Sequence, residues 1–215
     1  MSVPNDPSTV LDRLEAADEL LVQQVFRPVA NEYRISIPAP GSTEEGEPLL
    51  FVKQKKLKIK EDIRFRLTPD GEEHLFMIKA RSMLEVRGRY DVTDAAGGSL
   101  GSLEKSFGKS LLRSHWVVRD TAGTELFTAQ ESSLLIALVR RFVGMIPVVG
   151  SYAFFLQWLP FDFTLDRAGT HLGNYRRVLG KLRDRYVLHL TEASEGVDRR
   201  LLVAFTVALD ALQDR

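Results

Sequence analysis

The middle of the chain alternates between apolar and polar residues. Leu57 and Ile59 alternate with lysines, and Ile63, Phe65 and Leu67 alternate with Arg64 and Arg66. A period of two places successive side chains on opposite faces of a β-strand. The run Thr68-Pro69-Asp70-Gly71 then has the residues of a tight turn. The pattern predicts antiparallel strands, each with one apolar and one basic or acidic face.

This strand pattern is repeated at an interval of 26 residues. Each copy has an aromatic residue and a valine two positions apart, then Asp-x-Ala-Gly, then a leucine. The first copy is Tyr90, Val92, Asp94, Ala96, Gly97 and Leu100, and the second is Trp116, Val118, Asp120, Ala122, Gly123 and Leu126. Asp favours the start of a turn, and Gly adopts the left-handed conformation that closes it. The repeat predicts two successive hairpins, and Asp166, Gly169 and Leu172 indicate a third.

Three segments depart from alternation. Asp6-Pro7 predicts the start of a helix that continues to about Gln24. The run from Phe142 to Phe161 has no charged residue but contains Gly144, Pro147 and Gly150. We favour a buried or surface-docked helical insertion over residues 133–160, with an interfacial membrane element and a transmembrane helix as alternatives.

The third such segment is Val197 to Leu209, in which residues 201–209 are apolar on every side of a helix except at Thr206. Such a helix must be surrounded by apolar partners. Its length of about 20 Å is short for a bilayer and close to the height of a sheet wall. We therefore predict that it is a core element enclosed by strands, with Asp198 as its N-cap.

Composition narrows the class of protein. The 215 residues are 44% hydrophobic and carry 29 basic and 29 acidic residues, so no global field favours nucleic acid or membrane. The absence of cysteine excludes disulfides and thiolate chemistry. The first twelve residues have neither a basic nor an apolar region typical of a secretory signal, so we expect a cytoplasmic protein.

Motifs for catalysis or metal binding are weak. Gly97-Gly98-Ser99-Leu100-Gly101 matches the nucleophile elbow of hydrolases, but the second copy of the repeat keeps the turn and lacks the serine. The four histidines are scattered, without the spacing of a metal site. Asp94, Asp120 and Asp166 share a position before glycine, which favours turn formation over a calcium site. We predict no cofactor, no metal and no catalytic residue.

Basic residues are concentrated in one strand region. The candidate contacts for anionic lipid are Lys53, Lys55, Lys56, Lys58 and Lys60, together with Arg140 and Arg141 beside the uncharged run. Taken alone, the lysines favour a plainer interpretation, a solvated strand face that discourages edge pairing. No aromatic residues alternate with them as in a nucleic-acid stacking surface, so we expect no nucleic-acid partner.

Four stretches resemble bacterial LURP-one-related proteins, which belong to a superfamily with tubby C-terminal domains and phospholipid scramblases. They are Leu50 to Leu57, Phe76 to Arg81, Gly88 to Asp94 and Lys105 to Ser114. The resemblance implies a mainly β fold, a closed antiparallel tubby-like barrel of about twelve strands around an apolar C-terminal helix. We expect an N-terminal helical segment at 1–30 and the barrel domain at 31–215, with the helical insertion at 133–160.

Three functions follow from this, in order of preference. The first is a non-catalytic, scramblase-like barrel that binds lipid or a membrane surface, peripheral to the membrane. The second is a soluble scaffold or regulatory protein that docks a protein partner through the 133–160 segment. The third is a hydrolase at Ser99. The resemblance supplies no binding residues that map onto this sequence by motif, and the sequence leaves the ligand and the oligomeric state open.

Overall fold

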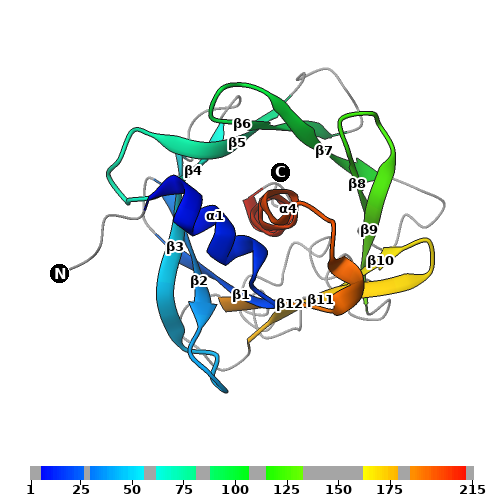
Figure 1. The fold of residues 1–215 in the computed structure, drawn as a ribbon, viewed down its shortest axis with the longest axis horizontal. Helices are drawn as coiled ribbons and strands as arrows, with labels where there is room; N and C mark the ends of the chain where they lie inside the picture. Colours follow the sequence, from blue (N-terminus) through cyan, green and yellow to red (C-terminus); the bar gives the residue numbers. More distant parts are fainter. Residues whose placement is uncertain are drawn as a thin grey trace, which may run out of the picture.

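The chain forms a closed β-barrel with a helix inside it. The computed structural model describes residues 6–26, 30–55, 62–80, 88–106, 115–132, 162–178 and 185–211. Over these ranges, twelve antiparallel strands follow one another around the ring, and the first strand pairs with both the second and the last. Helix α4 runs through the centre of the ring, and α1 lies across one end (Figure 1). The predicted barrel around an apolar C-terminal helix is confirmed.

The strands are β1 (Glu19–Phe26), β2 (Ala30–Pro38), β3 (Glu45–Lys55), β4 (Ile63–Arg66), β5 (His74–Ala80), β6 (Arg89–Asp94), β7 (Ser99–Ser106), β8 (His115–Arg119), β9 (Glu125–Glu131), β10 (Phe163–Arg167), β11 (Thr170–Arg177) and β12 (Arg185–Leu190). The helices are α1 (Pro7–Glu15), the short 3-10 helix η1 (Glu192–Ser194) and α4 (Arg199–Ala211). Neither α1 nor α4, the α-helices within the described ranges, has the length and apolar character needed to cross a membrane.

Helix α4 is the centre of the hydrophobic core. It starts after Asp198, whose Oδ1 accepts a hydrogen bond from the backbone N–H of Arg200 at 2.9 Å, as expected of an N-cap. Residues 201–209 are all buried. The ring of Phe205 meets Trp116, Phe127 and Phe163 edge-on, with ring centroids 6.3, 5.8 and 6.4 Å apart. Strands β8, β9 and β10 therefore pack on one aromatic residue of the helix.

The C-terminal end of α4 is held by two tyrosines. The hydroxyl of Tyr33 donates to Oδ2 of Asp210 at 2.8 Å, and that of Tyr186 donates to Oδ1 at 3.5 Å. Burial, and then the negative charge of Asp210, raise the pKa of Tyr33 far above its ordinary value. The two hydrogen bonds link the helix to β2 and β12, the strands on either side of β1.

The 26-residue repeat forms two hairpins, β6–β7 and β8–β9, as predicted. Oδ1 of Asp94 accepts the backbone N–H of Gly98 at 2.7 Å, and Oδ1 of Asp120 accepts that of Thr124 at 2.8 Å. Gly97 and Gly123 have φ of 86° and 84°, in the left-handed region that favours glycine. These aspartates are turn residues.

The prediction of one N-terminal helix through Gln24 is wrong. Helix α1 ends at Glu15, and Glu19–Phe26 is strand β1. Leu20 and Val22 belong to the core, whereas Leu21 lies outside it, which is the period of a strand. The apolar residues of this segment fit both periods, and the need to pair β2 and β12 selects the strand. The predicted insertion at 133–160 lies outside the described residues.

Candidate anion-binding surface

The outward side chains of three neighbouring strands are basic. Lys53 on β3, Arg64 and Arg66 on β4, and Lys79 on β5 alternate with residues of the barrel core. Since alternate side chains of a strand lie on opposite faces, these four cations share the outer face of the barrel. We call Lys53, Arg64, Arg66 and Lys79 the basic face.

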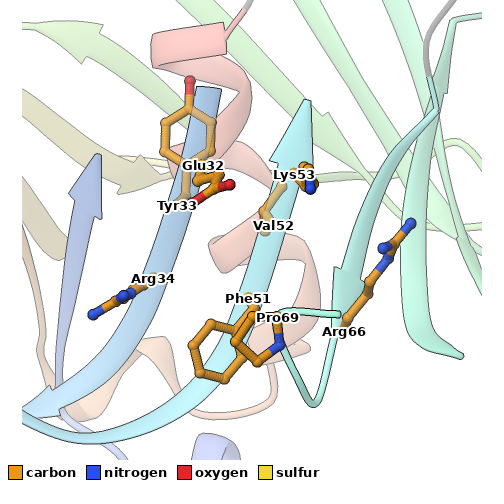
Figure 2. Close-up of a pocket in the computed structure, with 8 residues that line it drawn as sticks. All are labelled: Glu32, Tyr33, Arg34, Phe51, Val52, Lys53, Arg66 and Pro69. Carbon is orange, nitrogen blue, oxygen red and sulfur yellow. The ribbon is translucent and has the colours of Figure 1, made fainter. Parts of the chain in front are cut away.

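A small pocket lies beside the basic face, between β2, β3 and the turn after β4. It encloses about 30 Å³. Figure 2 shows Phe51 and Pro69 at one end of the pocket, with the charged ends of Lys53 and Arg66 toward the other. The pocket thus combines apolar contact with three cations, Arg34, Lys53 and Arg66, and one carboxylate, that of Glu32. Its lining residues are Glu32, Tyr33, Arg34, Phe51, Val52, Lys53, Arg66 and Pro69.

Carboxylates lie close to part of the basic face. Arg64 lies 3.9 Å from Asp62, and Glu32 and Asp91 are the cross-strand neighbours of Lys53 and Lys79, although no ion pair within 4.0 Å joins Lys53, Arg66 or Lys79 to a residue that the structure describes. On β7–β9, by contrast, one arginine has two carboxylates within ion-pair distance. Arg119 lies 3.8 Å from Glu104 and 4.0 Å from Glu125.

The pKa of His74 is affected by the positive charges of this surface. His74 is the first residue of β5 and pairs in register with Arg66 of β4. Burial lowers the pKa of His74, and the charges of Arg64, Arg66 and Lys79 lower it further. Nε of Arg66 and Nε2 of His74 are buried and have no hydrogen-bond partner among the described residues.

Only part of the candidate site expected from the sequence can be placed. Lys53 is exposed on the basic face, and Lys55 is the last residue of β3. Lys56, Lys58, Lys60, Arg140 and Arg141 lie outside the described residues, so their role stays a prediction.

Sequence reasoning did not select Arg64, Arg66 and Lys79. The signal was present, because both arginines occupy the polar positions of an alternating strand. The sequence alone does not show which strands are neighbours in the sheet. Strand β4 lies between β3 and β5, with Arg66 opposite Phe51, so the three strands place their cations on one surface.

The motifs for catalysis and metal binding have structural roles. Ser99 begins strand β7, which continues to Ser106, whereas a nucleophile elbow requires a helix after the serine. Within the described ranges, no three His, Asp or Glu side chains are close enough to hold a metal ion.

These features define a helix-filled antiparallel barrel with a basic outer face. The chain belongs to the LURP-one-related family, whose model matches residues 49–210. The family resemblance seen in the sequence is thereby confirmed, whereas kinship with tubby domains and scramblases stays a prediction. No curated protein and no solved structure matches the chain. The family match excludes α1, β1 and β2, although β1 and β2 complete the barrel.

Proposed function

We propose that this LURP-one-related barrel is a non-catalytic protein that binds the surface of anionic phospholipid membranes through its basic face. The observation that supports the proposal most directly is the arrangement of four cations on three adjacent strands, where Arg66 has Phe51 and His74, and no carboxylate, as its cross-strand neighbours. The pocket beside them adds Phe51 and Pro69, which can contact the apolar part of a headgroup region.

The charge of the basic face sets the strength of this binding. A lysine or arginine near an anionic membrane contributes ~1 kcal/mol, so four contribute at most on the order of 4 kcal/mol, and less because Asp62, Glu32 and Asp91 lie near three of them. The upper limit corresponds to a dissociation constant of about 1 mM, a weak and reversible attachment. The predicted contacts Lys55, Lys56, Lys58 and Lys60 follow Lys53 in the sequence and would strengthen it. The attachment is peripheral, at a cytoplasmic membrane surface.

The experiment is co-sedimentation with vesicles of phosphatidylcholine, with and without phosphatidylserine. We expect the protein to bind only the anionic vesicles and to be released by high salt. Lys53→Gln/Arg66→Gln/Lys79→Gln should abolish binding. Arg66→Gln should weaken binding. Arg176→Gln removes the same charge from an exposed position on β11 and should leave binding unchanged. Equal binding to neutral vesicles, or equal losses in the two single variants, would contradict the proposal.

The alternative of a protein partner docking on residues 133–160 concerns residues outside the described ranges and stays a prediction. Deleting 133–160 and comparing pull-downs tests it, because loss of a partner from a chain that remains folded would favour the scaffold function.

A further inference from the structure

The tip of the β2–β3 hairpin folds over the outside of the barrel. We call residues 39–47 the strap. Its three glutamates bind arginines from three different elements. Glu47 receives two hydrogen bonds from Arg13 of α1, at 2.7 and 2.8 Å, Glu44 lies 2.8 Å from Arg185 of β12, and Glu45 lies 3.6 Å from Arg34 of β2. Figure 1 shows this hairpin reaching outside the ring of strands near β1 and β12.

The strap lies over the place where the first strand closes the barrel. Leu21 and Gln23 point away from the core, yet they are only 0% and 1% exposed, and Ser36 of β2 is 1% exposed. Gln23 lies opposite both Arg34 and Arg185 in the sheet, and Leu21 lies opposite Ser36. Glu45 and Glu44 contact these two arginines, so the strap spans β1 from β2 to β12 at the level of Gln23.

Polar groups under the strap lack hydrogen-bond partners. They are Nε2 and Oε1 of Gln23, Oγ of Ser36 and Nε of Arg185, each buried and without a partner among the described residues. Burying a polar group without a hydrogen bond is unfavourable, and access of water removes this penalty. The closed strap is therefore opposed by the groups that it covers.

The ion pairs that hold the strap closed are open to solvent on the glutamate side. Glu44 and Glu47 have 55% and 64% of the side-chain surface accessible, against 15% and 28% for Arg185 and Arg13. The bidentate Arg13–Glu47 pair is the best formed of the three. Exposed ion pairs contribute little and are screened by salt. Salt-screened ion pairs therefore hold the strap closed, whereas the buried polar groups without hydrogen-bond partners favour its opening.

From this combination we propose that the strap is a salt-sensitive cover, which opens locally to uncover Leu21, Gln23 and Ser36 on the outer face of β1 and β2 while the barrel stays folded. The proposal does not rest on lipid binding, although Arg34, which pairs with Glu45 of the strap, also lines the pocket beside the basic face. It assigns a conformational role to a segment that the family match does not include.

Hydrogen exchange of the full chain, followed by mass spectrometry, tests the cover. The reporting amides are those of Ala39 and Ser42, which donate to the carbonyl oxygens of Glu44 and Ala39 at 3.2 and 3.0 Å. Raising the salt from about 0.1 M to about 1 M shortens the screening length from about 10 Å to about 3 Å, and exchange in the strap should become several-fold faster. The β6–β7 turn at Asp94, held by its own backbone and side chain, is the internal control.

Two substitutions should act in opposite directions. Glu44→Gln removes the ion pair with Arg185 and should speed exchange in the strap, whereas Glu192→Gln removes an exposed charge outside the strap and should leave it unchanged. Gln23→Met keeps the length of the side chain, removes the unpartnered amide and should slow exchange. Salt-independent exchange in the wild type, or faster exchange in Gln23→Met, would overturn the proposal. The salt series uses the unmodified chain, so its result does not depend on the folding of a variant.

Discussion

Asp210 shows how one residue fixes the central helix in the barrel. A carboxylate near the C-terminal end of a helix faces the negative end of the helix dipole. Tyr33 and Tyr186 compensate by donating hydrogen bonds to its two oxygens. The position of α4 along the barrel axis is thus defined by polar contacts in addition to packing.

Tyr33→Phe should therefore destabilise the protein. It leaves Oδ2 of Asp210 without its 2.8 Å donor, and the expected loss is about 1–3 kcal/mol in the free energy of unfolding. Urea unfolding measures it. Tyr186→Phe is the matched control and should cost less, because its hydrogen bond is longer, at 3.5 Å. An equal or larger loss in Tyr186→Phe would contradict this assignment.

Alkaline stability depends on the same tyrosine. The pKa of Tyr33 is raised in the folded protein, so its contribution is complete below the ordinary tyrosine pKa of about 10 and is lost as the pH rises above that value. The free energy of unfolding should fall above about pH 10, and Tyr33 should supply up to ~1.4 kcal/mol per pH unit of that slope. Urea titrations from about pH 8 to about pH 11, which bracket the ordinary tyrosine pKa, should give a smaller slope for Tyr33→Phe. An unchanged slope would argue against a raised pKa.

At the scale of elements, strands β4 and β5 make the basic face sensitive to pH. Burial and neighbouring cations lower the pKa of His74, so the imidazole resists protonation while the face is free. A bound anionic membrane opposes that positive potential and raises the pKa again, which couples protonation to binding. Binding to phosphatidylserine vesicles should therefore tighten as the pH falls below the ordinary histidine value of 6.5.

Co-sedimentation at a series of pH values tests this coupling. His74→Gln should bind at neutral pH and lose most of the pH dependence, while His171→Gln, on β11, should keep it. The groups around His74 are Arg64 and Arg66 of β4, Lys79 of β5 and Asp62, of which Asp62 alone favours the protonated form. Weaker binding at acid pH in the wild type would contradict the prediction.

The sequence predicted correctly those elements whose local pattern of residues is compatible with one structure only. The Asp-x-x-Gly turns and the all-apolar helix of residues 201–209 each have one physical solution, so β6–β9 and α4 were found from local sequence. Residues 19–26 were misassigned because Leu20, Leu21 and Val22 suit a helix or a strand, and only pairing with β2 and β12 decides. The basic face was found in part, since Lys53 belongs to a visible cluster and Arg66 joins it through strand pairing.

At the scale of the molecule, the N-terminal strand is an integral part of the barrel, although the family match starts at residue 49. Removing residues 1–29 would delete α1 and β1, expose the edges of β2 and β12, and uncover the core beside Leu20 and Val22. Exposed strand edges promote association between chains. We expect this truncated chain to aggregate, as judged by size-exclusion chromatography.

Deleting residues 1–5, which precede the N-cap Asp6 of α1, is the control and should leave a folded protein of unchanged elution volume. A monomeric, cooperatively unfolding chain that starts at Ala30 would show that the ring closes without its first strand.

Helix α4 also constrains how the protein is made. It follows all twelve strands in the sequence but occupies the space that they enclose. During synthesis the strands leave the ribosome before the segment on which Trp116, Phe127 and Phe163 will pack. Contacts between distant parts of a chain form slowly, and sheets that have not yet closed around the helix expose apolar surface. The apolar inner faces of the strands therefore have no helix to pack on until residues 199–211 have left the ribosome.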